Sequence, residues 1–245
     1  MCTLAVALQA DRRWPVVVAA NRDERLGRPS EGWAVRQEPG AARVAAPRDL
    51  QAGGTWIGLS AAGLFAAVTN FHAPLDWVPD PGRRSRGELV GLALRHPSAD
   101  AASEALRALD AALWNPFHLL VADGGSAFLW RHDGASAEIR PLGPGLHVVT
   151  ESSPDGSDPR GRLVRSRWPV DPSPARLREM LALHGDGGTP GCCIHRDPVY
   201  GTRSAAVLRV AASPAHSEIH VADGPPCVTP LAQRADLVAG LVRSA

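Results

Sequence analysis

Lysine is absent from the 245-residue sequence, so all 26 basic residues are arginine. No lysine amine is therefore available as a general base or as a Schiff-base nucleophile. The 25 acidic residues leave a net charge of +1. Because this balance offers no strongly basic surface to polyanions, we expect no nucleic acid and no anionic membrane among the partners.

Long apolar segments are also missing. No run of about 18 apolar residues could span a membrane, and the first residues lack the basic and apolar regions of a secretory signal. We expect a cytoplasmic protein with no transmembrane segment. With 44% hydrophobic residues and neither repeats nor a low-complexity linker, residues 1–245 are expected to form a single domain. The sequence carries no signal for an oligomeric state.

Cysteine is sparse, and its four positions follow no disulfide-framework spacing. Cys192 and Cys193 lie close to His195, but Cys227 alone does not supply the second ligand pair that a zinc site of this kind requires. We therefore expect no metal and no cofactor. Residues 192–195 are instead expected to lead as a strand toward the segment 200–208.

Cys2 is the cysteine with a specific chemical interpretation. Its small side chain favours removal of Met1, which would leave a thiol and a free α-amine on one residue. Such an amine has a pKa of about 7.7–8.0 and can accept the thiol proton near neutral pH. The resulting thiolate is a good nucleophile. The alternative is that Cys2 is only a small apolar residue that opens an edge strand.

Two apolar segments follow and predict a β-hairpin. Residues 3–8 and 15–20 are expected to be strands, with a polar turn at 9–14. The hairpin returns the chain to its own N-terminus and brings residues 21–24 beside Cys2. Strand alternation places Asn21 and Asp23 on one face and Arg22 on the other. The Asp23 carboxylate could therefore orient the amine or the thiol of Cys2.

Six short motifs occur in order over nearly the whole chain. They are AANRDE at 19–24, RP at 28–29, GGTWIG at 53–58, AVTN at 67–70, RGEL at 86–89 and YGTRS at 200–204. This set resembles the NRDE family, which contains relatives of transport and Golgi organisation protein 2. That family is in turn similar to N-terminal nucleophile hydrolases of the choloylglycine hydrolase and penicillin V acylase type.

The resemblance implies an αββα sandwich and cleavage of an amide by an N-terminal cysteine. It implies Cys2 as the nucleophile, Asp23 as its orienting carboxylate and Asn70 as an oxyanion donor. Asn21 matches a residue beside the hydrolase aspartate, which implies an oxyanion or orienting role. The candidates for substrate contact are Arg22, Trp56, Tyr200, Thr202 and Arg203.

Two positions depart from the hydrolase pattern. Ala20 stands where the hydrolases carry an arginine, and no asparagine occurs near residues 149–151, where a second oxyanion donor is expected. Glu151 in that region would oppose a developing oxyanion. Bile-salt or penicillin hydrolase activity therefore does not carry over directly.

The remaining chain shows the periodicities of strands and helices. Strands are expected at 53–60, 63–70, 117–122, 126–131 and 217–222, and helices at 89–95, 98–113 and 175–184. Ser85 and Glu88 predict a capping box at the first of these helices. Residues 26–52 are expected to form a long, irregular surface loop. The arginines of residues 159–167 are expected to lie on the solvent-exposed face of a helix. Together these elements predict an α+β fold, a four-layer αββα sandwich of two mainly antiparallel sheets.

Three functions are compatible with these features. The first is an N-terminal-cysteine amidohydrolase that cleaves the carbon–nitrogen bond of a small acylated substrate. The second is acyl transfer on the same scaffold. The third, suggested by relatives linked to haem trafficking and lipid homeostasis, is a non-enzymatic carrier of haem or of a lipid-related ligand. Because no Cys-x-x-Cys-His attachment motif is present, axial haem ligands would have to come from Cys2, His72, His118 or His195.

Overall fold

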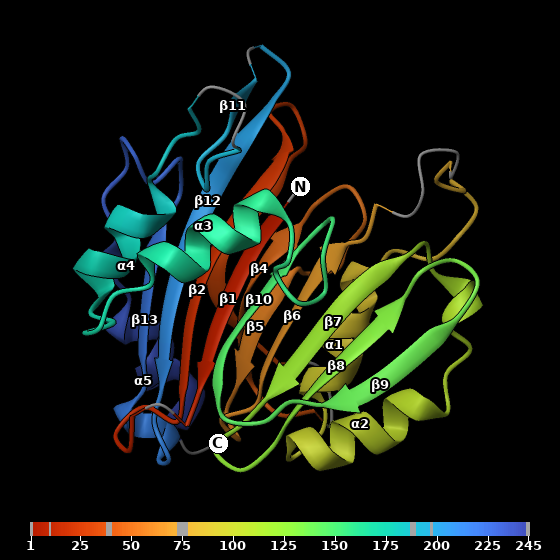
Figure 1. The fold of residues 1–245 in the computed structure, drawn as a ribbon. Helices are drawn as coiled ribbons and strands as arrows, with labels where there is room; N and C mark the ends of the chain where they lie inside the picture. Colours follow the sequence, from red (N-terminus) through yellow and green to blue (C-terminus); the bar gives the residue numbers. More distant parts are fainter. Residues whose placement is uncertain are drawn as a thin grey trace.

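Two antiparallel sheets face each other, and helices cover their outer surfaces (Figure 1). The structure is a computed structural model that describes residues 2–9, 11–37, 41–72, 78–186, 190–196 and 198–243. The expected α+β fold, an αββα sandwich of antiparallel sheets, is confirmed.

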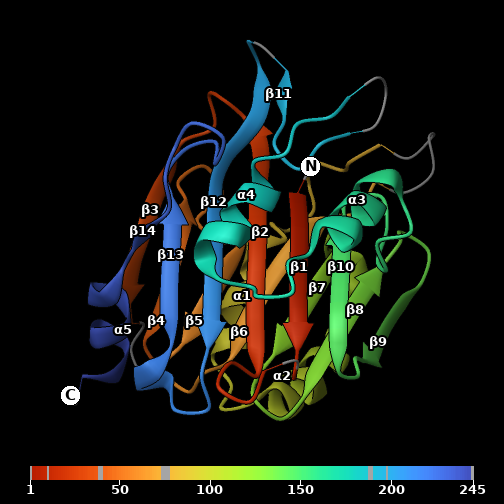
Figure 2. The ribbon, with the colours of Figure 1, turned by 60° about the vertical axis from the view of Figure 1, so that its left-hand side comes forward.

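The first sheet combines the N-terminal hairpin with strands from the second half of the chain. Its order is β10 (Gly145–Thr150), β1 (Cys2–Leu8), β2 (Val16–Arg25), β12 (Tyr200–Val210), β13 (Glu218–Ala222) and β14 (Ala232–Gln233), and β11 (His195–Arg196) pairs with the start of β12. Figure 2 shows β1 between the edge strand β10 and β2. Apolar runs such as 16–20 suit these strands, because both of their faces are covered.

The second sheet is a meander in which each strand pairs with the one before it. In chain order its strands are β3 (Ser30–Arg36), β4 (Val44–Asp49), β5 (Ile57–Ser60), β6 (Phe65–Asn70), β7 (Phe117–Ala122), β8 (Ala127–His132) and β9 (Ala137–Pro141). Pairing of successive strands is the usual result of short connections. The longer crossing from β6 to β7 carries the helices of this sheet.

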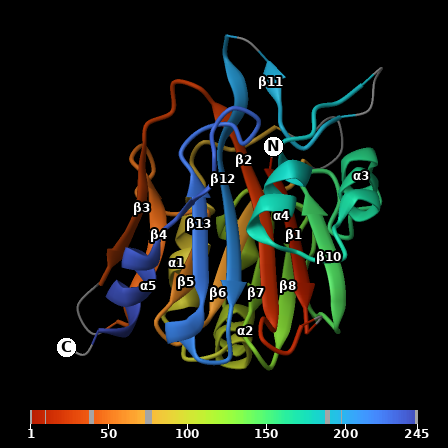
Figure 3. The same ribbon diagram turned by 90° about the vertical axis from the view of Figure 1, so that its left-hand side faces the viewer.

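Two helices cover each sheet, and a fifth closes one side. The helices α1 (Gly87–Leu94) and α2 (Ala99–Arg107) pack on the second sheet, and α3 (Pro159–Arg167) and α4 (Pro174–Leu181) pack on the first. The helix α5 (Ala235–Val242) lies between β13 and the β3–β4 hairpin (Figure 3). Two 3-10 turns are η1 (Ala111–Leu113) and η2 (Pro214–His216). Within the described ranges, none of the helices has the length and apolar content needed to cross a membrane.

Strand alternation sorts the apolar side chains of the first sheet into two layers. On β1, Leu4, Val6 and Leu8 belong to the core between the sheets, whereas Ala5 and Ala7 belong to the core under α3 and α4. The same period of two applies on β2, where Val18 faces inward and Ala19 outward. Successive residues of β1 and β2 therefore point alternately into the core between the sheets and into the core under α3 and α4.

The predicted N-terminal hairpin is confirmed, but its second strand is longer than expected. β2 continues through the polar motif to Arg25, because this stretch pairs with β12, with Thr202 opposite Asp23 and Tyr200 opposite Arg25. The strand expected from residue 53 begins only at Ile57. A Cβ atom on Gly54 would lie 2.6 Å from the carbonyl carbon of Gly87, so the glycine permits the close backbone approach that its pattern suggests.

Three local predictions are wrong. Residues 26–52 form the β3–β4 hairpin, whose Trp33 is buried between the sheets, so this segment is not an irregular excursion. The helix predicted at 98–113 ends at Arg107, and η1 follows because the Asp110 carboxylate accepts a hydrogen bond from the backbone of Ala112. The capping box does not form, since Arg86 is the N-cap of α1 and Glu88 instead pairs with Arg84.

The segment expected to lead as a strand toward residue 200 is also shorter than predicted. Only His195 and Arg196 form β11, and residues 192–194 approach the sheet without joining it. The helix predicted at 175–184 is α4 and ends at Leu181.

Candidate active site

Cys2 opens β1, the strand next to the edge strand β10, and lies directly opposite Arg22 of β2. On the other side of β1, Thr3 pairs with Thr150, so Glu151 follows immediately beyond the end of β10. The predicted convergence of Cys2 with the motif at 21–24 is therefore present. Met1, whose removal the sequence favours, lies outside the described residues.

The side chain of Cys2 contributes to a narrow pocket between the two sheets. Its walls are mainly apolar, from residues of both sheets that include Trp33, Trp56, Ile57 and Ala67, and Arg22 lies beside the thiol. Strand parity places Cys2 in this layer together with Leu4. A ligand that reaches the thiol from this side would meet apolar walls.

Two arginines give the thiol an electropositive border. The Arg22 guanidinium lies 4.1 Å from the centroid of the Trp56 ring and is 3.9 Å from the Glu24 carboxylate. Arg86, at the N-terminus of α1, donates a hydrogen bond to the Pro116 carbonyl at 3.1 Å. Burial lowers the pKa of Arg86 to about 10, so the side chain remains charged near neutral pH. Both arginines attract a thiolate at Cys2.

Desolvation acts against thiolate formation in the resting protein. Burial raises the pKa of the Cys2 thiol, and the Asp23 and Glu151 carboxylates add to this rise. The backbone of Asp23 acts in the opposite direction through a hydrogen bond to the sulfur. A base next to the thiol is therefore needed to generate the nucleophile at neutral pH.

Asp23 is buried on the opposite face of β2, toward α3. Its carboxylate accepts a hydrogen bond from the Thr202 hydroxyl at 2.6 Å and forms an ion pair with Arg160 at 3.3 Å. The Tyr200 hydroxyl donates to the Asp23 backbone carbonyl at 2.9 Å. Two of the residues predicted to contact substrate, Tyr200 and Thr202, thus contact Asp23.

Arg160 is the residue of this cluster that sequence reasoning missed. It was expected on a solvated helix face, but only 2% of its side chain is exposed, and its guanidinium lies 3.3 Å from both Asp23 and Glu151. The position is on the first turn of α3, which the Asp158 side chain caps by accepting from Gly161. Glu151, which would oppose an oxyanion if unpaired, has its charge compensated by this guanidinium.

Burial dominates the titration of Asp23, whose carboxylate shares the Arg160 guanidinium with Glu151. Burial raises the pKa of Asp23 from 3.8 to about 6, although Thr202 and Arg160 oppose the rise. Because the folded protein holds this proton more tightly than the unfolded chain, the contribution of Asp23 to stability is fully present below about pH 4. It is lost as pH rises through about 6.

The pH-dependent contribution of Asp23 should be measurable as the difference in free energy of unfolding between the wild type and Asp23→Asn. The advantage of the wild type in free energy of unfolding should fall by about 2 kcal/mol between pH 4 and pH 7, since each pKa unit corresponds to about 1.4 kcal/mol and the unfolded carboxyl is already partly ionised at pH 4. Urea unfolding of both proteins at several pH values measures the difference, and titrations common to both cancel. A difference that stays constant over this range would contradict the raised pKa.

Asn21 shares the outer face with Asp23, as alternation predicts. Its amide nitrogen donates to the carbonyls of Leu181 at 2.9 Å and Cys192 at 2.8 Å. Both amide hydrogens are therefore used to hold the end of α4 and the approach to β11. This geometry suits an orienting role for Asn21 better than donation to an oxyanion.

Asn70 is the last residue of β6 and lies opposite Phe117 of β7. The preceding Thr69 lines the pocket that contains Cys2, so the end of β6 borders the candidate site. Its proposed oxyanion role stays a prediction. Trp56 also lines the pocket, as the sequence predicts for a substrate contact.

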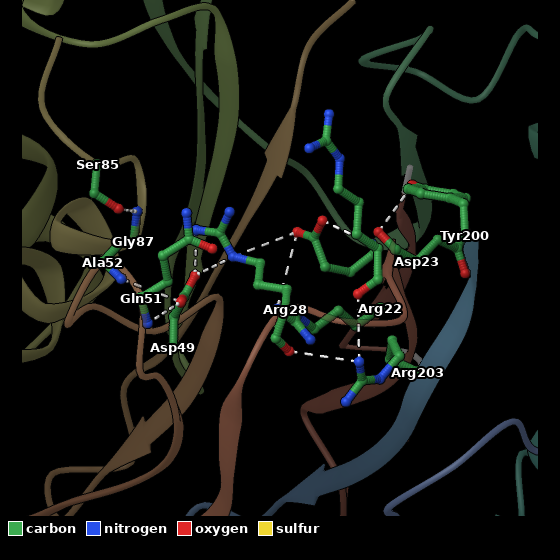
Figure 4. A network of polar contacts seen from close by, with 12 residues as sticks. Arg22, Asp23, Arg28, Asp49, Gln51, Ala52, Ser85, Gly87, Tyr200 and Arg203 are labelled. Atoms are coloured by element: carbon green, nitrogen blue, oxygen red, sulfur yellow. Dashed lines mark hydrogen bonds and ion pairs between the residues drawn. The ribbon is translucent and has the colours of Figure 1, made fainter. Parts of the chain in front are cut away.

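The remaining candidate, Arg203, belongs to a polar network at the rim of the sheet (Figure 4). It donates hydrogen bonds to the backbone carbonyls of Arg25, Leu26 and Arg28. Arg28 pairs in turn with Asp49 at 2.6 Å. Arg203 thus anchors the turn after β2, and its guanidinium contacts backbone groups.

The histidines considered as haem ligands lie in different environments. His118 is buried, its Nδ1 lies 3.4 Å from the Thr69 hydroxyl and 3.2 Å from the Thr150 carbonyl, and burial lowers its pKa to about 4. His118 is therefore a core histidine, as its apolar strand suggests. His195 lies on β11, beside Cys193 and Cys227.

Known proteins resemble this chain in sequence and in fold. The human Transport and Golgi organization protein 2 homolog is 36% identical over 120 residues, which is 46% of this chain and 40% of the human protein. The bovine homolog is 32% identical over 147 residues, which is 56% of this chain and 50% of the bovine protein. The aligned regions thus span about half or less of these relatives.

Solved structures share the fold at low sequence identity. A Caenorhabditis elegans ortholog of N-acylethanolamine-hydrolyzing acid amidase superposes with a TM-score of 0.60 at 12% identity, over 99% of this chain and 98% of that one. A C2A mutant of the conjugated bile acid hydrolase from Clostridium perfringens gives 0.53 at 12% identity, over 95% and 96%. Penicillin V acylase from Agrobacterium tumefaciens gives 0.51 at 13%, over 91% and 83%.

These structures are N-terminal nucleophile hydrolases, and the fold of this chain is theirs. A family model described as Transport and Golgi organisation 2 matches residues 1–169, more than half of the chain and all of the segment from Cys2 to Arg160. The chain therefore belongs to the Transport and Golgi organisation 2 family.

Proposed function

We propose that the protein is an N-terminal-cysteine amidohydrolase that cleaves the carbon–nitrogen bond of a small acylated substrate. The observation that supports it most is the place of Cys2. It opens an internal strand with a partner on each side, faces a narrow apolar pocket, and lies close enough to the buried Asp23 and Glu151 carboxylates for their charges to act on its thiol. The similar solved structures are a conjugated bile acid hydrolase, an ortholog of an N-acylethanolamine-hydrolyzing acid amidase and a penicillin V acylase.

The reaction uses Cys2 as both nucleophile and base after Met1 is removed. The free α-amine takes the thiol proton, and the thiolate attacks the substrate carbonyl carbon. Asn70 and backbone N–H groups hold the oxyanion. The tetrahedral intermediate then collapses, the carbon–nitrogen bond breaks, and the ammonium of Cys2 protonates the leaving amine. Water attacks the thioester, releases the carboxylic acid and regenerates the thiol.

The acidic cluster has a positioning role in this scheme. Asp23 orients the ammonium of Cys2, and Arg160 keeps its carboxylate in place while compensating Glu151. Arg22 and Arg86 favour the thiolate and the developing oxyanion. The walls of the pocket, including Trp33 and Trp56, are apolar like an acyl group, and the pocket, with a volume of about 20 Å³, has to widen when such a group binds.

The first test is the intact mass of the purified protein before and after brief exposure to iodoacetamide. We expect a mass without one methionine, and one rapid alkylation that is absent from Cys2→Ala and retained in Cys192→Ala. Burial of Cys192 raises its thiol pKa to about 12, which makes it a slow competitor. Retained methionine, or slow labelling spread over all four thiols, would contradict the mechanism and favour a ligand carrier.

A substrate screen then separates hydrolysis from acyl transfer. The panel contains an N-acylethanolamine, a conjugated bile acid and penicillin V, the substrate types that the names of similar structures specify. Amine release without an added acceptor is expected. Release that occurs only with an amine or thiol acceptor would instead assign acyl transfer on the same scaffold.

A further inference from the structure

Four side chains that can ligate a metal come together at the β11 end of the first sheet. They are His184, Cys193, His195 and Cys227, and one ligand atom from each lies within 4.8 Å of all the others. The Sγ atoms of Cys193 and Cys227 are 3.6 Å apart. The His195 Nε2 lies 3.5 Å from the first sulfur and 3.2 Å from the second.

These separations match the edges of a tetrahedron around zinc. With Zn–S distances of about 2.3 Å and Zn–N distances of about 2.0–2.1 Å, two sulfurs lie about 3.8 Å apart, and sulfur and nitrogen about 3.6 Å apart. The three distances within the cluster fall within 0.4 Å of those edges. The fourth vertex falls to His184, whose ring meets the His195 ring edge-on at 5.1 Å between centroids.

The backbone holds the ligands from three separate segments. His184 follows α4, and the Cys193 N–H donates to the Leu183 carbonyl at 2.9 Å. A side chain on Gly191 would collide with the backbone at His184 and Gly185, so this glycine permits the segment 191–195 to lie against the end of α4. Cys227 lies in the turn closed by the Thr229 N–H and the Pro225 carbonyl.

A disulfide is a poorer explanation of the same residues. Its sulfurs would be about 2.05 Å apart, whereas those of Cys193 and Cys227 are 3.6 Å apart with a histidine nitrogen close to both. A disulfide would also not explain why the His184 side chain lies close to Cys193, His195 and Cys227. Two sulfurs with two imidazole nitrogens form the donor set that zinc prefers in tetrahedral sites.

We propose that His184, Cys193, His195 and Cys227 bind one Zn²⁺ in a closed structural site. Binding releases the two thiol protons to solvent and leaves four protein ligands with no open position. The exposed rings of His184 and His195 give the ion access, while Cys193 is buried. Figure 2 shows the hairpin of β11 and β12 projecting beyond the rest of the first sheet, so a crosslink there would restrain it.

The proposed zinc site is connected to the Asp23 cluster through Thr202. The Thr202 hydroxyl accepts from the Ile194 N–H at 2.9 Å while donating to Asp23 at 2.6 Å. Asn21 holds the Cys192 carbonyl. The ion would thus stabilise the segment 192–195 that supports Asp23, without contacting Cys2.

The test is the zinc content of the protein, purified under reducing conditions, dialysed against micromolar zinc and then against metal-free buffer. We expect one zinc per chain in the wild type, in Cys192→Ala and in Cys2→Ala, and a loss of most of it in Cys227→Ser and His195→Asn. Because Cys227 is half-buried and His195 exposed, these variants should fold even if a Cys193 variant does not. The Cys2→Ala result keeps this proposal separate from the hydrolase mechanism.

Two further readouts strengthen the test. Cobalt in place of zinc should give thiolate charge-transfer bands and intense tetrahedral d–d bands that both ligand variants lack. A strong chelator should lower the melting temperature of the wild type by several degrees and leave that of Cys227→Ser unchanged. Zinc well below one per chain in the wild type, equal zinc in Cys192→Ala and Cys227→Ser, or a Cys193–Cys227 disulfide in the reduced preparation would overturn the proposal.

Discussion

Cys2→Ala is expected to lower kcat/KM for an amide substrate by about 10⁴-fold or more, since loss of a nucleophile leaves only binding and oxyanion stabilisation. The substitution removes one sulfur from a narrow pocket and leaves the pairing of β1 with β2 intact. Its unfolding midpoint should therefore stay close to that of the wild type. Alanine also permits methionine removal, so the variant retains the free amine.

The matched control is Cys192→Ala, which removes a thiol of the core under α3 and α4. It is expected to keep turnover close to that of the wild type, because only the Cys192 backbone carbonyl contacts Asn21. Steady-state kinetics and circular dichroism on the three proteins compare activity at equal folding. Turnover that survives in Cys2→Ala would remove the cysteine from the mechanism, whichever substrate is used.

Arg160→Met is expected to lower the free energy of unfolding by about 3–5 kcal/mol at neutral pH, the usual cost of removing one partner of a buried ion pair. Methionine keeps much of the side-chain volume, so the loss comes mainly from the two carboxylates. Asp23 and Glu151 would be left buried without the guanidinium that lies 3.3 Å from each. The deficit should shrink as pH falls below about 6, because the Asp23 carboxyl, whose pKa is raised to about 6, then carries a proton and needs no partner charge.

Arg167→Met is the control, because it removes an exposed arginine from the same helix. We expect it to change stability by less than about 0.5 kcal/mol, the usual range of surface substitutions. The double variant Arg160→Met with Glu151→Gln should recover part of the loss, since one unpaired charge is removed. Urea unfolding at pH 5 and pH 7.5 measures all three. Equal losses in Arg160→Met and Arg167→Met would show that the buried ion pairs carry little energy.

Sequence reasoning was most successful where the structure depends on neighbours along the chain. The hairpin of β1 and β2 follows from two apolar segments around a polar turn. The alternation of side chains along β2 placed Asn21 and Asp23 on one face of the strand and Arg22 on the other. The ordered motifs indicated the family and its αββα fold. Asp23 was selected because a strand that returns to its start brings its end beside Cys2.

Local reasoning failed where a residue's environment is created by packing between distant segments. The helix that contains Arg160 has a strongly polar composition. Its sequence does not indicate that this guanidinium packs on the outer face of the first sheet and contacts Asp23, 137 residues earlier. The β3–β4 hairpin was missed because several of its residues are exposed at a sheet edge. Only Trp33 of β3 is fully buried, so the strand has too few apolar residues to show an alternating pattern.

The Cys/His cluster illustrates the same division. Spacing along the chain supplied Cys192, Cys193 and His195, and a zinc site was rejected because Cys227 alone does not make a second pair. His184 and Cys227 enter from the end of α4 and from a turn after β13, brought there by the sheet order and the close contact at Gly191. The sequence by itself determined the N-terminal hairpin, the family and the place of Cys2, because these depend on local periodicity and motifs. Only the tertiary structure decided the partners of Asp23 and the fourfold cluster, because these depend on which segments pack together.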